Sequence, residues 1–391
     1  MKKITIGLLW HSVHSGNLGV VALTESQIAI LKECANKVGC QLELIIFGWH
    51  PDGTADPSSP AASHEFVSIT AKSLLNPGSR VHQALSRCAL VLDVGEGDSF
   101  SDIYGLKRLI YMAVTKRLAS ARSRLVLAPQ TIGPFSTKLS TGIANWALSG
   151  VQHAFARDPL SMEWLVAHGF GANSSVTIDM AFKLPYSPTP SGRGVTKVGL
   201  NVSGLLYSGG YSGHNELGLS LDYKTLTHRM IEWLLEQTDT QVFLVPHVSS
   251  KDIPSEDDIQ TSRALTERYP QLQMAGPFGS PIHAKTFMSG LDFFSGGRMH
   301  ACLGAFSSGV PTLPMAYSRK FNGLFNSIGY PHFVDCKVET TDQALSKFQA
   351  AFIGRETLRQ RVSEGNASAQ LKLKPYSDYL VAQMQVLARH D

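Results

Sequence analysis

Arg298 and His300, two positions apart, are the residues in this chain best suited to chemistry on an anion. A guanidinium can hold a carboxylate or a phosphate through two hydrogen bonds, and an imidazole can move a proton near neutral pH. The apolar run at residues 291–294 predicts a buried strand just before this pair. Apolar residues at three- and four-residue spacing in 299–308 predict a helix after it. The pair therefore falls where a strand ends and a helix begins.

Such a junction is where open α/β sheets bind ligands, and the free N–H groups of a helix N-terminus attract anions. Gly296 and Gly297 predict a sharp turn there, which a ligand can approach closely. The alternative is structural, with Arg298 paired to a carboxylate and His300 packed or capping locally. The two glycines and the later Lys320 favour a binding site.

A second strand end carries His247, which follows Pro246 at the end of the predicted strand at 241–245. It is a further candidate for the site, with an ordinary loop histidine as the alternative. Near the N-terminus, a predicted strand at 4–10 leads through Asn17 and Gly19 into a predicted helix. This order resembles a phosphate cradle without matching a known fingerprint, so a plain tight turn is the alternative.

Three carboxylates follow the predicted strand at 89–94, namely Glu96, Asp98 and Asp102. They can bind a hard metal ion, recognise or deprotonate sugar hydroxyls, or, through Asp98 or the neighbouring Ser101, cap a helix. The sequence leaves these three possibilities open.

Arg157 stands just before Pro159, which is typical of the first turn of a helix. At that junction its guanidinium could reach a bound anion. The alternative is a structural ion pair, such as one between Arg157 and Asp158.

The composition indicates a globular chain, with 43% hydrophobic and 17% charged residues among 391. A net charge of +4 without a basic run argues against nucleic acid as the partner. The five cysteines match no zinc spacing, so we expect buried thiols in a reducing compartment. No stretch has transmembrane length, and the predicted location is the cytoplasm, including the inner face of the membrane.

The length predicts two α/β domains, because a chain of this size exceeds one ordinary core. Prolines and glycines make residues 183–196 the clearest linker, and the alternation of strands and helices restarts after it. We therefore predict one Rossmann-like domain at 1–185, on the acceptor side, and another at 195–391. The second would carry the donor site and terminal helices from about 341 to 389.

The chain resembles the polysaccharide pyruvyl transferase family over about residues 4–330. The motifs that carry the resemblance are Asn17-Leu-Gly19, Gly97-Asp-Ser-Phe-Ser-Asp102, Thr131-Ile-Gly-Pro-Phe135, Arg157-Asp-Pro-Leu-Ser161, Asp179-Met-Ala-Phe182, Gly297-Arg-Met-His300, Gly309-Val-Pro311, Tyr317-Ser-Arg-Lys320 and Ile328-Gly329. Arg-x-His with its downstream proline and lysine is the most specific part.

The resemblance implies two Rossmann-like domains facing across a cleft, as in GT-B glycosyltransferases. It also implies transfer of a pyruvyl group from phosphoenolpyruvate to a sugar, usually as a ketal. The acceptor would be a polysaccharide, an oligosaccharide or a lipid-linked precursor, in polysaccharide or exopolysaccharide biosynthesis. Two departures, Val20-Val21 where many members carry acidic residues and Gly95-Glu-Gly97 in place of a glycine run, leave the acceptor sugar open.

We predict His300 as the general acid and base, Arg298 as an anion clamp and Asp98 as the residue that orients an acceptor hydroxyl. The predicted substrate contacts are Arg157, Lys320, Asn17, Gly19, His247, Gly297 and Tyr317. The scheme uses no metal or cofactor, since phosphoenolpyruvate is a substrate. Peripheral membrane association and homo-oligomer formation are left open. The alternatives are a glycosyltransferase that uses a nucleotide sugar and a non-catalytic paralogue that binds glycans.

Overall fold

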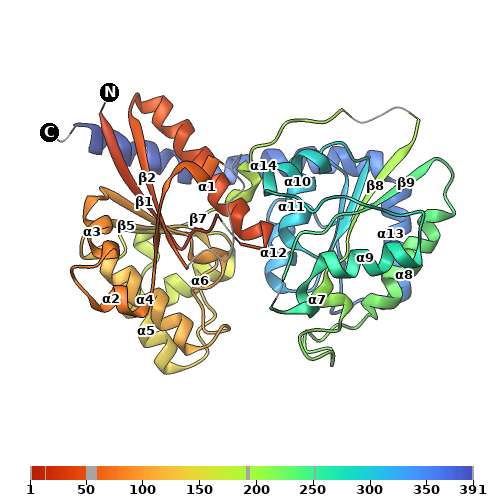
Figure 1. The fold of residues 1–391 in the computed structure, drawn as a ribbon, viewed down its shortest axis with the longest axis horizontal. Coiled ribbons are helices and arrows are strands. Elements are labelled where there is room, and N and C mark those ends of the chain that lie inside the picture. The colour runs from red at the N-terminus through yellow and green to blue at the C-terminus, as the bar shows by residue number, and fades with distance from the viewer. Residues whose placement is uncertain (1, 14, 50–59, 191–193, 251, 390–391) are drawn as a thin grey trace. The chain divides into compact units, whose positions relative to one another are not determined.

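A computed structural model describes residues 2–13, 15–49, 60–190, 194–250 and 252–389. The chain divides into two compact units, each built on one parallel sheet with helices packed on it (Figure 1). The first unit comprises Met1–Ser15, Leu23–Lys183 and Gln370–Asp391, and the second comprises Gly16–Ala22 and Leu184–Ala369.

The sheet of the first unit has seven parallel strands in the order β3-β2-β1-β4-β5-β6-β7. The strands are β1 (Lys3–Leu9), β2 (Gln41–Gly48), β3 (Glu65–Ser68), β4 (Leu90–Asp93), β5 (Arg124–Gln130), β6 (His153–Ala156) and β7 (Ser174–Val176). Every residue of β4 is buried, as expected for a strand covered by helices on both faces. The direction of strand order reverses between β1 and β4, which is the point where doubly wound sheets bind ligands.

The helices of the first unit connect these parallel strands. They are α1 (Leu18–Val38), α2 (Ala71–Leu75), α3 (Arg80–Arg87), α4 (Leu106–Ser120), α5 (Lys138–Leu148) and α6 (Pro159–Ala167), with short 3₁₀ turns η1 (Pro60–Ser63), η2 (Gly95–Gly97), η3 (Gly171–Asn173) and η4 (Met180–Lys183). A core of buried aliphatic and aromatic side chains, including Trp10, Phe47 and Phe100, lies against the sheet.

The second unit repeats this plan with six parallel strands in the order β10-β9-β8-β11-β12-β13. The strands are β8 (Thr196–Asn201), β9 (Thr240–Leu244), β10 (Gln273–Met274), β11 (Phe293–Gly296), β12 (Thr312–Ala316) and β13 (Val334–Asp335). The order reverses between β8 and β11. Both sheets therefore have Rossmann-type topology, as the sequence predicted.

The helices of the second unit are α7 (Gly204–Tyr207), α8 (Tyr223–Leu235), α9 (Asp258–Arg268), α10 (Pro281–Met288), α11 (Met299–Ser307), α12 (Arg319–Ser327) and α13 (Thr341–Ile353), with the 3₁₀ turn η5 (Pro254–Glu256). A last helix, α14 (Arg355–Arg389), follows α13 and confirms the predicted helical C-terminal segment. None of the helices in the described ranges is both long enough and apolar enough to cross a bilayer.

The units differ from two contiguous domains at 1–185 and 195–391 in two places. Residues 16–22 group with the second unit because Asn17 bridges to Val248 and Leu18 N–H donates to the His247 carbonyl. Residues 370–391 group with the first, where Tyr376 lies buried beside Phe155. Sequence position alone could not show these contacts. Residues 191–193 of the predicted linker lie outside the described residues.

All five cysteines are buried and free of disulfides, which confirms the predicted buried thiols. Burial raises the pKa of Cys88 and of Cys336 to about 12, so both stay protonated near neutral pH. These thiols act as packing groups.

Candidate functional site

The junction between β11 and α11 places Arg298 at the N-cap position of α11. Its backbone N–H donates to Asn201 Oδ1 at 2.8 Å, and Asn201 is the last residue of β8. Strands β8 and β11 are the pair at which the strand order reverses. Arg298 therefore lies at the predicted ligand-binding edge of this sheet.

The bend predicted at the two glycines before Arg298 begins only at Gly297, directly after the end of β11. Gly296 is still within β11, and neither glycine has a positive φ. They are needed for close packing instead. A Cβ on Gly297 would lie 2.8 Å from Leu206 Cδ1 and 2.9 Å from the Tyr223 hydroxyl.

The Arg298 side chain forms a buried ion pair with Asp258. Its Nη2 lies 2.9 Å from Asp258 Oδ1 and its Nε lies 3.2 Å from the same oxygen, while Nη2 also donates to the Glu256 carbonyl at 2.7 Å. Burial acts to lower the pKa of the guanidinium, but the charge and hydrogen bonds of Asp258 raise it above its usual value. The structural carboxylate partner considered for Arg298 is thus present, and it holds the guanidinium charged at the strand edge.

Asp258 connects three strand ends, and it was not predicted as a site residue. Its carboxylate accepts hydrogen bonds from the backbone N–H groups of Gly204, His247 and Val248, and from the Asn201 side chain. It is fully buried. The available signal was the Asp257-Asp258 pair at a helix start. The Asp257 side chain caps α9, whereas the Asp258 side chain is buried in the protein.

His247 lies just past the end of β9 and is buried. Neither ring nitrogen has a hydrogen-bond partner among the described residues. Burial, and then the positive charges of His300 and Arg298, lower the pKa of His247 to about 3. The imidazole is therefore neutral near neutral pH, and the backbone N–H of His247 donates to the same Asp258 carboxylate as the Arg298 guanidinium.

The segment from Gly16 to Ala22 contacts this same group of residues. Leu18 N–H donates to the His247 carbonyl at 3.1 Å, and Asn17 Oδ1 accepts from Gly19 N–H at 2.9 Å. A Cβ on Gly19 would lie only 2.4 Å from His300 Nδ1. Asn17 and Gly19, predicted on the acceptor side, therefore group with the candidate donor residues, and Gly19 is required for the close approach to His300.

Tyr317 and Lys320 lie between the end of β12 and the first turn of α12. Both side chains are half-buried. Ser318 caps α12 by accepting from Phe321 N–H, which sets the start of this helix. The structure thus brings the start of α12 to the same carboxyl edge of the sheet as Arg298, because β11 and β12 are adjacent and parallel.

In the first unit, the carboxyl end of β4 is held by a buried ion pair. Lys116 Nζ lies 3.0 Å from Asp93 Oδ2, and both side chains are fully buried. The ammonium also lies 4.1 Å from the centroid of the Phe100 ring. Asp93 Oδ1 accepts from Gly95 N–H at 2.8 Å, so this pair supports the turn η2 that precedes Asp98.

The three carboxylates after β4 take separate partners. Glu96 pairs with Arg108, and Asp98 Oδ1 accepts from the Tyr104 hydroxyl at 3.1 Å. Asp102 accepts from the N–H and hydroxyl of Ser136 and from the hydroxyl of Ser140. The following helix α4 begins after Gly105 with no side-chain cap, so capping by Asp98 or Ser101 was wrong.

Arg157 is buried, and its ion-pair partner is Asp179 at 2.7 Å. Its Nε donates to Thr131 Oγ1 at 3.0 Å. Asp158, the partner considered from the sequence, caps α6 instead. A Cβ on Gly97 would lie 3.3 Å from Arg157 Nη1, so Arg157 lies against the η2 turn.

The family model described as polysaccharide pyruvyl transferase matches residues 42–319. The chain belongs to this family. It is therefore a transferase, as the motifs predicted. The matched stretch contains Asp98, Arg157, His247, Arg298 and His300, whereas Asn17, Gly19 and Lys320 lie outside it. A search of curated proteins found no significant match.

Solved structures similar to this pyruvyl transferase have the GT-B fold, which confirms the predicted fold class. The Alr3699/HepE protein of Anabaena, in complex with UDP and glucose, gives a TM-score of 0.59 at 11% identity over 99% of this chain and 100% of its own. UDP-GlcNAc 2-epimerase of Neisseria meningitidis, bound to UDP-GlcNAc, gives 0.57 at 10% identity over 98% and 99%. The MnaA–UDP structure from S. aureus gives 0.57 at 12% identity over 97% and 98%. At such identities the similarity establishes the fold alone.

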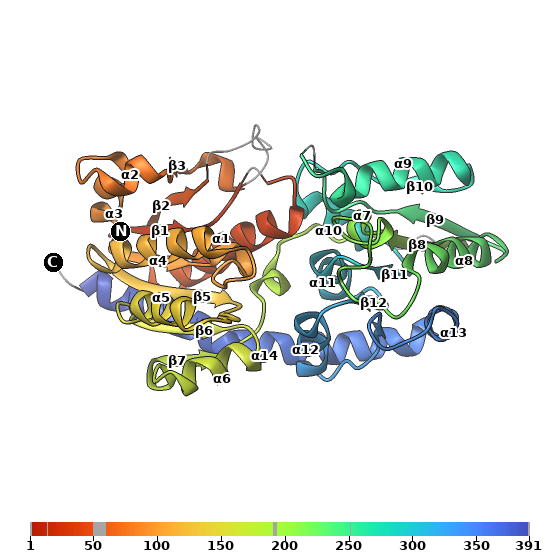
Figure 2. The ribbon, with the colours of Figure 1, turned by 90° about the horizontal axis from the view of Figure 1, so that it is seen from below.

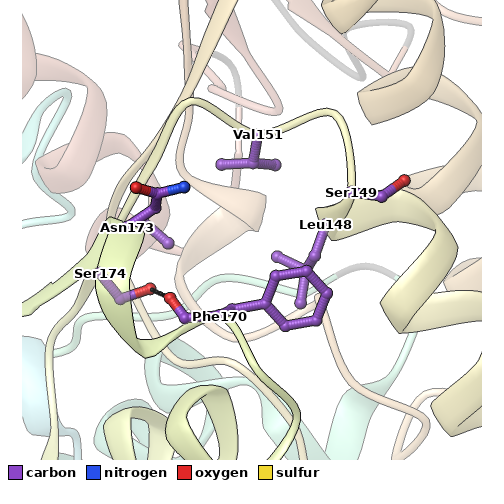
Figure 3. Close-up of a pocket in the computed structure, with 7 residues that line it drawn as sticks. Leu148, Ser149, Val151, Phe170, Asn173 and Ser174 are labelled. Atoms are coloured by element: carbon purple, nitrogen blue, oxygen red, sulfur yellow. Dashed lines mark hydrogen bonds between the residues drawn. The ribbon is translucent and has the colours of Figure 1, made fainter.

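The first unit also contains a hollow of about 150 Å³ (Figure 3). It is lined by Leu148, Ser149, Val151, Ala154, Phe170, Asn173 and Ser174. None of these seven lining residues is ionisable, and none is a predicted site residue. We therefore place the candidate site at the strand ends and not in this hollow.

Proposed function

We propose that this pyruvyl transferase moves a pyruvyl group from phosphoenolpyruvate to a sugar and closes it as a ketal across two hydroxyls. The observation that carries the proposal is the group formed by Arg298, His300 and the neutral His247. It lies at the carboxyl edge of the second sheet, where the strand order reverses between β8 and β11. A fixed cation beside a proton-transfer group suits a substrate that has both a carboxylate and a phosphate.

Arg298 is proposed to bind an anionic group of the pyruvyl donor. In the described hydrogen bonds of its side chain, Nε donates to Asp258, and Nη2 donates to Asp258 and to the Glu256 carbonyl. We assign Nη1 to the carboxylate or phosphate, with Lys320 as a second cation from the start of α12. Asp258 fixes the guanidinium before the substrate arrives, which lowers the conformational entropy lost on binding.

His300 is proposed to give and take protons during transfer. Protonation of the methylene carbon of phosphoenolpyruvate makes C2 electrophilic, and a sugar hydroxyl attacks C2. The bond between C2 and the phosphate oxygen then breaks, and a second hydroxyl attacks C2 to close the ketal. Of the two hydroxyl protons, one replaces the proton delivered to carbon and the other leaves with inorganic phosphate, so the reaction is balanced without an oxidant or a reductant.

Asp98 is proposed to orient or deprotonate an acceptor hydroxyl. It follows the η2 turn. The buried Asp93–Lys116 ion pair holds the start of this turn, and Arg157 packs against Gly97 within it. The Tyr104 hydroxyl already donates to Asp98 Oδ1, so this carboxylate is held in one orientation. The acceptor class is a polysaccharide, an oligosaccharide or a lipid-linked precursor with two neighbouring free hydroxyls.

The test is incubation with phosphoenolpyruvate and a panel of hexosides and N-acetylhexosaminides that carry free diols. Release of inorganic phosphate that depends on the sugar, together with a product that retains the carboxylate, would support the proposal. The His300→Ala variant should bind phosphoenolpyruvate with near wild-type affinity but turn over about 10²–10⁴-fold more slowly. Its control is His214→Ala on an exposed loop. Release of a nucleoside diphosphate from a nucleotide sugar would indicate a glycosyltransferase instead.

A further inference from the structure

A long basic stretch of the first unit contains no acidic residue. Between Asp102 and Asp158 the chain has 55 residues with eight lysines and arginines and no aspartate or glutamate. That local charge is twice the formal net charge of +4 of the whole chain. Lys116 and Arg157 are buried in ion pairs, and Arg108 pairs with Glu96, so the remaining five basic side chains belong to the surface.

Helices α4 and α5 of this stretch lie side by side (Figures 1 and 2). At their starts, Asp102 accepts hydrogen bonds from Ser136 and Ser140. Near their ends, the Arg117 guanidinium lies 5.7 Å from the centroid of the Trp146 ring. These contacts run from start to start and from end to end, so the two helices point in the same direction and share one outer face.

This outer face combines exposed apolar and basic side chains, and we name it the α4–α5 surface. Six large apolar side chains on it are between 41% and 60% exposed: Ile103, Tyr104, Leu106, Ile110, Leu139 and Trp146. Lys107 and Lys138 are exposed beside them. Single exposed apolar residues are ordinary, but four on two adjacent helices, together with Ile103 and Tyr104 in the turn before α4, form a group typical of an interaction site.

We propose that the α4–α5 surface binds the face of an anionic phospholipid bilayer. Leucine and isoleucine can enter the boundary of the acyl chains, and tyrosine and tryptophan favour the headgroup level. Lysines at the rim attract anionic headgroups. A second copy of the chain fits this surface less well, because two-fold symmetry would bring the same exposed lysines together.

The experiment is flotation of the full-length protein with vesicles of phosphatidylcholine alone or with one quarter phosphatidylglycerol. We expect binding to the anionic vesicles, weak binding to the neutral ones, and loss of binding as salt rises from 0.05 to about 0.5 M, since salt screens the exposed lysines. Equal binding to both vesicle types, or no binding to either, would overturn the proposal.

Variants separate the contribution of the lysines to vesicle binding from that of the apolar side chains. Lys107→Gln with Lys138→Gln should weaken binding about fivefold per lysine, and Leu106→Gln with Ile110→Gln should weaken it at least tenfold. The control is Leu75→Gln with Lys72→Gln on α2, which are also exposed and lie on another helix of the same unit. Thermal unfolding should be unchanged in all three, because the substituted side chains are exposed.

Sedimentation without lipid tests the competing occupant. If the wild-type chain forms a dimer that Leu106→Gln with Ile110→Gln dissociates, the surface is a subunit interface and the lipid proposal fails. If the control variant loses vesicle binding as much as the lysine variant does, binding follows overall charge and not this surface, which also rejects it. The flotation result is independent of pyruvyl transfer, so failure here leaves the proposed activity standing.

Discussion

Arg298 donates from Nε and Nη2 to a single oxygen of Asp258, and the same carboxylate accepts from the backbone at the ends of two other strands. One buried negative charge thus positions the guanidinium and the strand edge together. This relationship makes Asp258 a positioning residue for the candidate site, although it has no place in the recognisable motifs.

Asp258→Asn should lower the free energy of unfolding by about 3 kcal/mol, because it leaves the Arg298 charge buried without its partner. The new amide would also point hydrogens toward the N–H groups of His247 or Val248. Urea denaturation followed by circular dichroism measures the loss. Asp222→Asn is the control, since asparagine replaces an exposed N-cap aspartate at little cost. Equal effects of the two variants would contradict the role assigned to Asp258.

Arg298→Lys should reduce kcat/KM for phosphoenolpyruvate by roughly 30- to 1000-fold, since a charged donor in the transition state contributes about 2–4 kcal/mol. Lysine keeps the charge but cannot reach Asp258 and the substrate with one planar group. Calorimetry with phosphoenolpyruvate should show weaker binding. Arg263→Lys, exposed on α9, serves as the control. Wild-type activity in Arg298→Lys would show that only the charge matters.

Gly19→Ala should lower turnover by displacing the His300 ring, because the added Cβ would lie 2.4 Å from Nδ1. Gly323→Ala on α12 is a matched control, as its Cβ would meet nothing within 4 Å. We expect at least a tenfold drop in kcat for the first variant and none for the second, with thermal unfolding of Gly323→Ala unchanged or raised. Wild-type turnover in Gly19→Ala would show that the position of the His300 ring does not depend on the segment at residues 16–22.

The stability of the protein should fall as the pH drops below about 6. The folded pKa values of His247 and His11 are lowered by burial to about 3, whereas an unfolded histidine titrates near 6.5. Between these values the unfolded chain binds more protons, so the free energy of unfolding decreases toward acid by up to about 1.4 kcal/mol per pH unit for each histidine.

Urea denaturation at pH 7, 6 and 5 measures this slope. His247→Gln removes one titrating group, so its unfolding free energy should depend less steeply on pH than that of the wild type. The slope is informative even though the substitution also changes absolute stability. His214→Gln, on an exposed loop, should leave the slope as it is. An unchanged slope in His247→Gln would mean that His247 is not held neutral by the fold.

Asp98→Asn should slow pyruvyl transfer and leave the dissociation constant for phosphoenolpyruvate within about twofold of wild type. The amide keeps the shape but cannot accept a proton from a sugar hydroxyl. Titration with phosphoenolpyruvate alone, and turnover at varied acceptor concentration, separate the two effects. Loss of phosphoenolpyruvate binding in this variant would show that Asp98 acts in binding the pyruvyl donor and not on the acceptor.

The sequence alone was sufficient for the alternation of strands and helices, because apolar periodicity and glycine or proline breaks are local signals. The strand before Arg298, the helix after it and the long C-terminal helix follow from such patterns, and the spaced motifs identified the family. The packing role of Gly297 did not follow, since its reason is the closeness of Leu206 and Tyr223, which are distant in the chain.

Only the tertiary structure decided which residues surround the candidate site. Asp258 contacts Arg298, which is 40 positions away in the sequence, and Gly19 contacts His300, which is separated from it by most of the chain. Arg157 pairs with Asp179 and not with its neighbour Asp158, because the neighbour caps a helix. A parallel sheet brings strand ends together whatever their separation in sequence, and a buried charge selects the partner that this arrangement places within reach.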